Sequence, residues 1–186
     1  MRFASMRNLD ISNGEGVGVS LFVQGCDRHC FNCFNPDTWD FNGGKEWTEE
    51  TKNKFIKLID RPYINRISVL GGEPLAEQNL DEVLSLIKEI RISFPAKTIW
   101  LYTGFCWNDI MCSFAGLQAD YVVLDKKDIE AWEKRKKIIS NVDVLVDGEY
   151  IDEQKDLSLI FKGSKNQRVI DVKQSLAQNK IVLYCN

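Results

Sequence analysis

Three cysteines crowded into one short stretch are the residues best suited to carry chemistry. Cys26, Cys30 and Cys33 have the spacing Cys-x3-Cys-x2-Cys. A cubane iron–sulfur cluster normally has four cysteine ligands, one for each iron. Three local cysteines without an obvious fourth leave one iron open to a substrate, much as a catalytic zinc keeps one open position. The spacing therefore predicts a [4Fe–4S] cluster on these three residues.

Zinc is the alternative occupant of this loop, and disulfides are the alternative use of the cysteines. Structural zinc usually takes two closely spaced pairs of ligands, whereas the single histidine, His29, is adjacent to Cys30, where neighbouring side chains seldom converge on one ion. The other cysteines lie far along the chain, and a reducing compartment keeps thiols free. We expect these others to be small buried hydrophobic residues, namely Cys106, Cys112 and Cys185.

A second motif, Gly71-Gly72-Glu73-Pro74, directly follows an apolar run at residues 66–70. Paired glycines let the backbone approach a ligand closely, and the proline biases Glu73 toward an extended conformation. A carboxylate and exposed backbone groups at the end of a strand suit a ligand that bears an ammonium group. An ordinary turn between a strand and a helix is the alternative interpretation.

Extended apolar runs alternate with segments of helical periodicity along the chain. This alternation favours βα units and a mostly parallel sheet. A complete eightfold barrel takes roughly 250 residues, and this chain has 186. We therefore expect an α/β fold, an open partial barrel of about five or six mostly parallel strands with outer helices. The expected strands are residues 18–25, 66–70, 98–102, 121–124 and 142–146, and the expected helices are residues 49–59 and 80–90 and a third marked by Ile129, Trp132 and Ile139.

Polar residues follow each predicted strand, at the edge of the sheet where barrel enzymes build their sites. The cysteine loop and the Gly-Gly-Glu-Pro motif follow the first two strands. Thr103, Asp125 and Asp147 follow the later ones, where helix-capping or turn roles are the alternative to a role in the site. The glycine-rich stretch 14–18 precedes a strand, so it is interpreted as a flexible lead-in and not as a phosphate-binding loop.

Composition and charge exclude several classes of function. The chain is 44% apolar and 27% charged, and its formal net charge is -3, with positive and negative residues mixed along the sequence. Electrostatic binding of nucleic acid or anionic lipid over a broad surface is therefore not expected. No secretory signal and no apolar window of roughly 20 residues is visible, which predicts a cytoplasmic location. We expect one domain over residues 1–186, with a core at about residues 15–150 and a C-terminal extension at residues 151–186.

The cysteine spacing together with the Gly-Gly-Glu-Pro motif resembles the radical S-adenosylmethionine (SAM) superfamily. Residues 14–26 are similar to the first strand of glycyl-radical activating enzymes. Four later segments resemble the activating proteins of anaerobic ribonucleoside-triphosphate reductases, and the similarity extends from about Asn8 to Asp171. These segments are residues 33–39, 100–105, 143–148 and 161–171.

This resemblance implies a reaction and its partners. The amino and carboxylate groups of SAM would chelate the open iron, and a small donor such as flavodoxin or ferredoxin would supply one electron. The S–C5′ bond would break to give methionine and a 5′-deoxyadenosyl radical. That radical would take a hydrogen from a glycine near the C-terminus of the large reductase subunit, which is the implied protein substrate. No nucleic acid or membrane partner is implied.

The resemblance also implies roles for individual residues. Glu73 and the two glycines before it would hold the methionyl ammonium of SAM. Asn32 and Phe34, on either side of Cys33, would lie along the adenine. Ribose or carboxylate contacts would fall to Thr103, Asp125 and Asp147. The wider superfamily commonly has an aromatic residue at the position of Asn32, whereas the activating-protein branch tolerates a small or polar one.

The segment Lys162–Arg168 carries three cations around Gly163 and is a candidate for seating the reductase over an open barrel mouth, with a solvated loop as the alternative. A wide, open site can admit a protein loop, which favours a protein substrate. Three other functions stay open. They are an activase of another glycyl-radical enzyme, a small-molecule radical SAM synthase of the deazaguanine type, and a non-catalytic zinc-binding scaffold.

Overall fold

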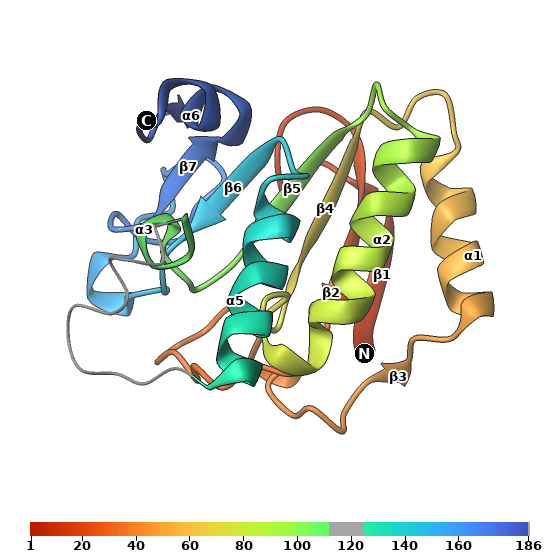
Figure 1. The fold of residues 1–186 in the computed structure, drawn as a ribbon, viewed down its shortest axis with the longest axis horizontal. Coiled ribbons are helices and arrows are strands. Elements are labelled where there is room, and N and C mark those ends of the chain that lie inside the picture. Colours follow the sequence, from red (N-terminus) through yellow and green to blue (C-terminus); the bar gives the residue numbers. More distant parts are fainter. Residues whose placement is uncertain (112–124, 186) are drawn as a thin grey trace.

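A mixed β-sheet of eight strands organises the chain in the computed structural model, which describes residues 1–111 and 125–185 (Figure 1). The strands are β1 (Arg2–Asp10), β2 (Gly18–Val23), β3 (Lys45–Glu46), β4 (Arg66–Gly71), β5 (Thr98–Tyr102), β6 (Val144–Asp147), β7 (Arg168–Asp171) and β8 (Leu183–Cys185). The helices are α1 (Glu49–Ile59), α2 (Leu80–Ser93), α3 (Trp107–Met111), α5 (Lys126–Ile139) and α6 (Val172–Gln178), with short 3-10 turns at Pro36–Thr38, Glu77–Asn79 and Asp152–Gln154.

The centre of the sheet is parallel and its flanks are antiparallel. The strand order is β3-β1-β2-β4-β5-β6-β7-β8, in which β2, β4, β5 and β6 pair in parallel. These four strands correspond to four of the predicted ones, whereas the predicted strand at residues 121–124 lies outside the described residues. The described chain has more strands than predicted because β1, β3, β7 and β8 add antiparallel pairings.

The predicted helices are present, and local capping explains where they begin. Helix α1 begins after Thr48, whose hydroxyl accepts a hydrogen bond from the Thr51 backbone N–H at 3.2 Å. Helix α5 begins after Asp125, whose carboxylate accepts from the Asp128 backbone N–H at 2.8 Å. Such a side-chain cap satisfies a backbone donor that the first helical turn leaves unpaired. Asp125 therefore has the helix-capping role that was the alternative to a ligand contact.

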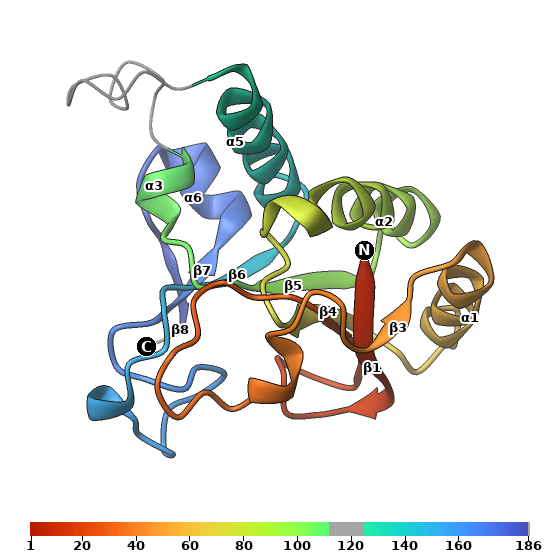
Figure 2. The same cartoon turned by 90° about the horizontal axis from the view of Figure 1, so that it is seen from below.

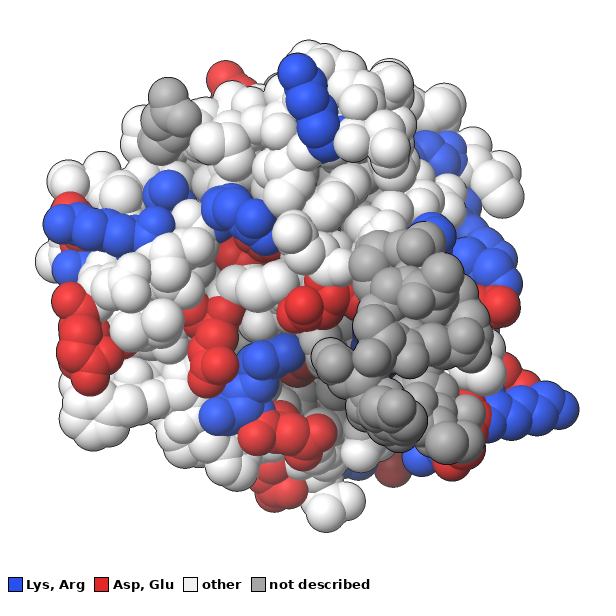
Figure 3. All heavy atoms as spheres, turned by 60° about the vertical axis from the view of Figure 1, so that its left-hand side comes forward, with Lys and Arg blue, Asp and Glu red and all other residues white. Residues whose placement is uncertain are grey.

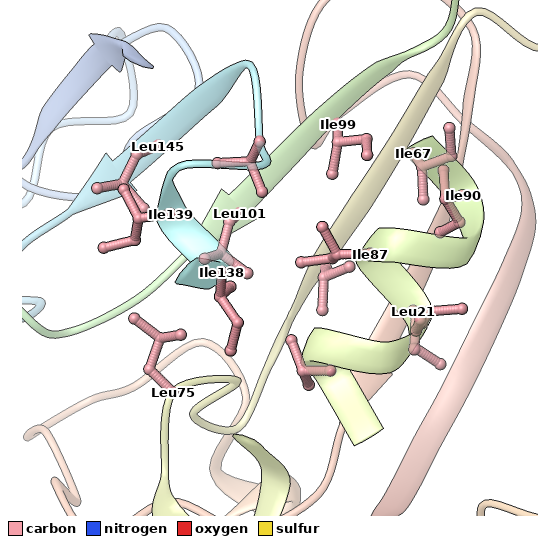
Figure 4. Close-up of a cluster of buried hydrophobic side chains, with 14 of the residues drawn as sticks. Leu21, Ile67, Leu75, Ile87, Ile90, Ile99, Leu101, Ile138, Ile139 and Leu145 are labelled. Atoms are coloured by element: carbon pink, nitrogen blue, oxygen red, sulfur yellow. The ribbon is translucent and has the colours of Figure 1, made fainter. Parts of the chain in front are cut away.

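The hydrophobic core lies between the sheet and helices α1, α2 and α5. Because successive strand residues point to opposite faces, alternate residues of β2, β4, β5 and β6 enter this core. They meet side chains that recur on one face of α2 and of α5 (Figure 4). The residues that interlock there are Leu21, Ile67, Ile87, Ile90, Ile99, Leu101, Ile138, Ile139 and Leu145, all fully buried.

Connecting segments, and not helices α1, α2 and α5, cover the opposite face of the sheet. Figure 2 shows that the chain after β2 and the chain after β6 lie on that side. Trp100 is buried there, and the rings of Phe161 and Tyr184 pack edge-on against it at centroid distances of 5.0 and 5.2 Å. The Tyr184 hydroxyl also hydrogen-bonds Glu15. Residues 151–185, predicted as an extension, thus contribute β7 and β8 to the same sheet.

A buried ion pair fills the same face at the start of β4. The Arg66 guanidinium donates to the Asp10 backbone oxygen at 2.7 Å and to its carboxylate at 3.1 Å, and both side chains are almost fully buried. A Cβ at Gly14 would lie 2.6 Å from Arg66 Cδ, so only glycine fits against the guanidinium stem. Gly14 is therefore tightly packed, and the interpretation as a flexible lead-in is wrong at this residue, whereas Gly16 has no neighbour within 4 Å of an added Cβ.

Charges of both signs are interspersed on the surface (Figure 3), in keeping with the small net charge of -3. In the described part of the chain, no helix combines the length and apolar character needed to cross a membrane.

Candidate functional site

All three cysteines of the predicted cluster line one cavity of about 560 Å³. The floor of this cavity is a row of side chains from the four parallel strands, which face away from the helix-covered core. These are Phe22, Leu70, Tyr102 and Val146, and the register places Phe22 opposite Leu70 and Tyr102 opposite Val146. A cavity of this size is in the range that small ligands and cofactors occupy. The parallel strands therefore bring the predicted motifs to one shared site.

The cysteine loop is held in a compact turn. The Cys33 backbone N–H donates to the Cys30 carbonyl at 3.1 Å, and the Cys33 sulfur accepts from the Asn35 N–H at 3.3 Å. Two residues of the loop, His29 and Asn32, have left-handed backbone angles, with φ of 48° and 54°. Cys26 is buried and the other two thiols are half-buried. The turn thus presents three thiols to one cavity from only eight residues of chain, Cys26 to Cys33.

The local environment favours the neutral form of two of these thiols when no metal is bound. Burial raises the pKa of the Cys30 thiol to about 11, and the Glu149 carboxylate, 3.5 Å from the sulfur, adds to this rise. Burial also raises the pKa of Cys26. Because metal ligation requires thiolates, loading iron onto this loop would release protons.

The donor set fits a cubane cluster. In residues 1–111 and 125–185, no three His, Cys, Asp or Glu side chains are grouped so that they could hold one metal ion. A cubane has no such requirement, since each cysteine binds a different iron. Three thiols on the wall of one cavity supply three of the four ligands, and the open cavity beside them has room for a ligand on the fourth iron.

The Glu73 carboxylate is buried and is surrounded by donors from the protein. It accepts hydrogen bonds from the Leu75 N–H at 2.9 Å, the Thr103 hydroxyl at 2.7 Å and the Gly104 N–H at 2.9 Å. Burial raises the pKa of Glu73, while these hydrogen bonds and the nearby Arg28 act in the opposite direction. The carboxylate therefore ties the end of β4 to the end of β5. Its predicted contact with a ligand ammonium stays a prediction.

The paired glycines let the motif pack against the start of the cysteine loop. A Cβ at Gly72 would lie 2.5 Å from the Gly25 carbonyl oxygen, and that same oxygen accepts the Glu73 backbone N–H at 2.7 Å. Gly71 has a φ of +108°, a conformation that other residues rarely adopt. Both glycines line the cavity, and they bring β4 close to the start of the cysteine loop.

The two residues predicted to lie along an adenine have different surroundings. Phe34 lines the cavity, with its ring 5.0 Å from that of Tyr150. Asn32 is absent from the described cavity wall, and its amide donates to the Asp152 carboxylate at 2.9 Å. Asn32 has a left-handed backbone, a conformation that asparagine tolerates better than a bulky side chain does.

Asp147 has a structural role in the described chain. Its buried carboxylate accepts from the Trp107 backbone N–H at 2.7 Å and from Arg168 Nε at 2.9 Å. Arg168 is thereby engaged with the fold, which removes it from the set of cations available for docking. In the same segment, Lys165 is exposed and forms only an ion pair at 3.6 Å with Asp156.

The remainder of the segment 162–168 builds a wall of the cavity. The Gln167 side-chain oxygen accepts from the Gly163 N–H at 2.9 Å and the Ser164 N–H at 3.1 Å, and its amide nitrogen donates to the Gly148 carbonyl at 2.9 Å. A Cβ at Gly163 would lie 2.8 Å from the ring of Phe34. This loop therefore packs directly on the cysteine loop.

Sequence reasoning missed several residues of this site. Glu149 contacts the Cys30 thiol, and Arg28 pairs with Glu73. Tyr150 and Phe161 line the cavity. Arg28 could have been found, because it lies between two predicted cluster ligands. Of the other cysteines, Cys106 and Cys185 are half-buried free thiols that do not line the cavity, and Cys112 lies outside the described residues.

Comparison with known proteins identifies the class that this fold and site define, an iron–sulfur protein. Residues 12–170 match the family described as the 4Fe-4S single cluster domain. The chain is 33% identical over 171 residues to the anaerobic ribonucleoside-triphosphate reductase-activating protein of Salmonella typhi, covering 91% of this chain and 97% of that one.

Two further relatives have the same name. The protein of Escherichia coli K12 is 32% identical over 171 residues, covering 91% of this chain and 97% of that one. The protein of Enterobacteria phage T4 is 30% identical over 169 residues, covering 91% and 93%. The chain belongs to the family of anaerobic ribonucleoside-triphosphate reductase-activating proteins, which confirms the family that its motifs predicted.

Proposed function

We propose that this protein is a radical SAM activase that reductively cleaves SAM and generates a glycyl radical on an anaerobic ribonucleoside-triphosphate reductase. One observation carries the proposal. Cys26, Cys30, Cys33 and the Gly-Gly-Glu-Pro motif, separate in sequence, line the same cavity at the ends of the parallel strands. The names of the relatives supply the target, since each is a reductase-activating protein.

The architecture supports this assignment. Four parallel strands with helices on one face and a cavity on the other are what an open barrel of the radical SAM type would present. We propose that β2, β4, β5 and β6 are the barrel portion of one domain. The antiparallel strands β1, β3, β7 and β8 would extend that sheet at both edges.

We assign roles in binding the cluster and SAM to some of the residues that line the cavity. A bound cluster would supply one electron and an open iron for the amino and carboxylate groups of SAM. Main-chain groups of Gly71 and Gly72 would lie against the methionyl ammonium, and Glu73 would hold that loop in place. Phe34 would pack along the adenine, and the apolar floor of the cavity would exclude water.

The proposal also names partners and a compartment. The protein substrate would be the large subunit of the reductase, and a flavodoxin or ferredoxin would deliver the electron. The cytoplasm keeps thiols reduced, which suits three unpaired cysteine ligands, so we propose that location.

The test begins with anaerobic reconstitution of the cluster. Reduced protein incubated with SAM is expected to form 5′-deoxyadenosine, measured by chromatography and mass spectrometry. With the reductase added, electron paramagnetic resonance is expected to show a glycyl radical. Product without a radical on this reductase would redirect the proposal to another substrate, and a well-folded, cluster-loaded protein that forms no product would refute it.

Four exposed apolar side chains on two segments beside the cavity suggest where the reductase docks. They belong to the two segments, residues 30–34 and 157–161, that line the cavity, and exposed apolar patches of this kind often mark protein interfaces. The set, called the rim below, is Phe31 (74% exposed), Phe34 (55%), Leu157 (85%) and Ile160 (53%).

Leu157→Asp is expected to weaken binding of the reductase and to lower glycyl-radical yield at least about tenfold, as loss of an interface anchor does. Its formation of 5′-deoxyadenosine without the reductase is expected to match the wild type, because Leu157 lies at the edge of the cavity with 85% of its surface exposed and has no assigned contact with SAM. Radical yield is measured by electron paramagnetic resonance and binding by sedimentation.

Ile92→Asp is the matched control. Ile92 is 81% exposed and lies on α2, the helix on the opposite side of the sheet. It is expected to leave radical yield unchanged. Equal effects of the two substitutions, or none from Leu157→Asp, would show that the rim is not the docking surface.

A further inference from the structure

Arg28 lies inside the cysteine loop and lines the cavity. Its Nε is 3.5 Å from Glu73 Oε2, and its Nη1 is 3.8 Å from Glu149 Oε2. The guanidinium carbon also lies 4.4 Å from the centroid of the Phe105 ring. With 26% of its side chain exposed, the guanidinium is held mostly out of water between two carboxylates and an aromatic face.

The hydrogen-bonding capacity of this guanidinium is unused within the described structure. A guanidinium has five N–H donors, yet Arg28 donates no hydrogen bond to any described residue, and its buried Nε has no partner at hydrogen-bond geometry. Its Nη2 takes part in neither ion pair. Buried donors left unpaired cost free energy, so a group of this kind points to a partner that the protein does not itself supply.

The neighbouring backbone is shaped to accommodate Arg28. A Cβ at Gly104 would lie 2.2 Å from Arg28 Cδ and 2.4 Å from its Nε. Gly104 has no left-handed φ, and the three atoms nearest to such a Cβ all belong to Arg28. An alanine at this position would therefore displace the Arg28 side chain.

Two other cations line the cavity, and neither is placed like Arg28. Arg7 comes from β1, where it pairs with Asp10 at 3.5 Å and lies over the Phe22 ring at 4.6 Å. Lys162 comes from the cavity wall that the segment between β6 and β7 forms. Of these three cavity-lining cations, Arg28 is the one that pairs with a residue of the Gly-Gly-Glu-Pro motif, Glu73.

The chemistry of an α-amino acid decides what such a cation would meet. Its ammonium and carboxylate are attached to the same carbon, so a loop that receives the ammonium has the carboxylate within a few ångströms. The Glu73 carboxylate cannot take the negative group, and Arg28 beside it can. The planar fork of an arginine matches a carboxylate, and holding it between Glu73 and Glu149 fixes its orientation in advance.

We propose that Arg28 binds the carboxylate of the methionyl group of SAM and thereby distinguishes SAM from ligands that lack it. This inference rests on the proposed function. Arg28 is a binding residue for the cofactor, and the two glutamates that flank it are positioning residues.

Equilibrium binding of SAM to the cluster-loaded protein tests the inference without relying on turnover. Arg28→Gln is expected to weaken SAM binding about 10- to 100-fold, the loss typical of a charge-assisted hydrogen bond. Lys165→Gln, which removes an exposed cation outside the cavity, is the control and is expected to bind as the wild type does.

The decarboxylated analogue of SAM separates recognition from general damage. This analogue is expected to bind equally well to the wild type and to Arg28→Gln. The ratio of its dissociation constant to that of SAM should therefore fall in Arg28→Gln by the same factor by which SAM binding weakens. If Arg28→Gln lost affinity equally for both ligands, or bound SAM as the wild type does, the inference would be overturned. If the loaded wild type bound no SAM, the proposed function itself would fail.

Iron and sulfide content is measured for every variant. If Arg28→Gln does not retain its cluster, Arg28→Lys keeps the charge without the fork and is expected to lose part of the preference. Gly104→Ala provides an independent route, because it displaces the guanidinium. It is expected to weaken SAM binding in the wild type and to add nothing to a cluster-competent Arg28 variant. Additive losses would show that Gly104 acts independently of Arg28.

Discussion

Replacement of Cys30 by alanine is expected to remove the brown colour, to reduce bound iron and sulfide to background, and to abolish formation of 5′-deoxyadenosine. The physical reason is the number of cluster ligands. Three thiols leave one iron of the cubane without a protein ligand, and loss of the Cys30 thiol would leave two irons without one. The fold should persist, because Cys30 is only half-buried and alanine removes a single sulfur atom, which approaches Glu149 at 3.5 Å. Metal analysis and the product assay measure the effect, and circular dichroism checks the fold.

Cys106→Ser is the matched control for this variant. Cys106 is also a half-buried free thiol, but it does not line the cavity. It is expected to keep its iron, its sulfide and its activity. Equal losses in both variants would contradict the assignment of the cluster to the cysteine loop, and so would an active, iron-loaded Cys30→Ala protein.

Asp10→Asn is expected to lower the free energy of unfolding by about 3–5 kcal/mol, as removal of one partner from a buried ion pair does. Arg66 is fully buried and would keep its charge without a counter-ion. The loss would extend to the turn after β1, since the Asp10 carboxylate also accepts the backbone N–H groups of Ser12 and Asn13, each at 2.9 Å. Urea unfolding followed by circular dichroism measures the change.

Glu130→Gln is the control, since Glu130 pairs with Lys126 on the exposed surface of α5 at 3.8 Å. Exposed pairs contribute little, so we expect a change below about 1 kcal/mol. If the two substitutions cost the same, the buried pair would not be the reason for the stability of this region.

The same aspartate predicts a dependence on pH. Burial raises the pKa of Asp10, but hydrogen bonds from Asn13, Arg66 and Ser12 outweigh it and lower the pKa from 3.8 to about 2. A carboxyl group whose pKa is lower in the folded state stabilises the fold above its unfolded pKa and loses that effect as the pH falls. The wild type should therefore lose stability between about pH 4 and pH 2 more steeply than Asp10→Asn does.

The parallel centre of the fold could be predicted because its strands are buried on both faces. The apolar runs in β2, β4, β5 and β6 are therefore nearly continuous. The flanking strands lack this signal. In β1, buried, half-buried and exposed residues alternate without a clear period, and β8 spans three residues, two of them exposed.

The residues of the candidate site also differ in how far they could be predicted from the sequence. The cysteines and the glycines of Gly-Gly-Glu-Pro could be found because their chemistry is local in sequence. The partners of Glu73 could not, since Thr103 lies 30 residues away and is brought to it only by the pairing of β4 with β5. The Arg66–Asp10 pair, 56 residues apart, was hidden for the same reason.

The two outermost strands, β3 and β8, are only two and three residues long. Long unpaired strand edges are templates on which other chains add, and they are a common starting point for aggregation. On the β8 side, an edge this short offers few free backbone groups for such addition. On the other side, β3 pairs only with Arg2 and Phe3, so the rest of β1, up to Asp10, forms the edge of the described sheet. Addition of a strand from a second chain is therefore expected at β1 and not at β8.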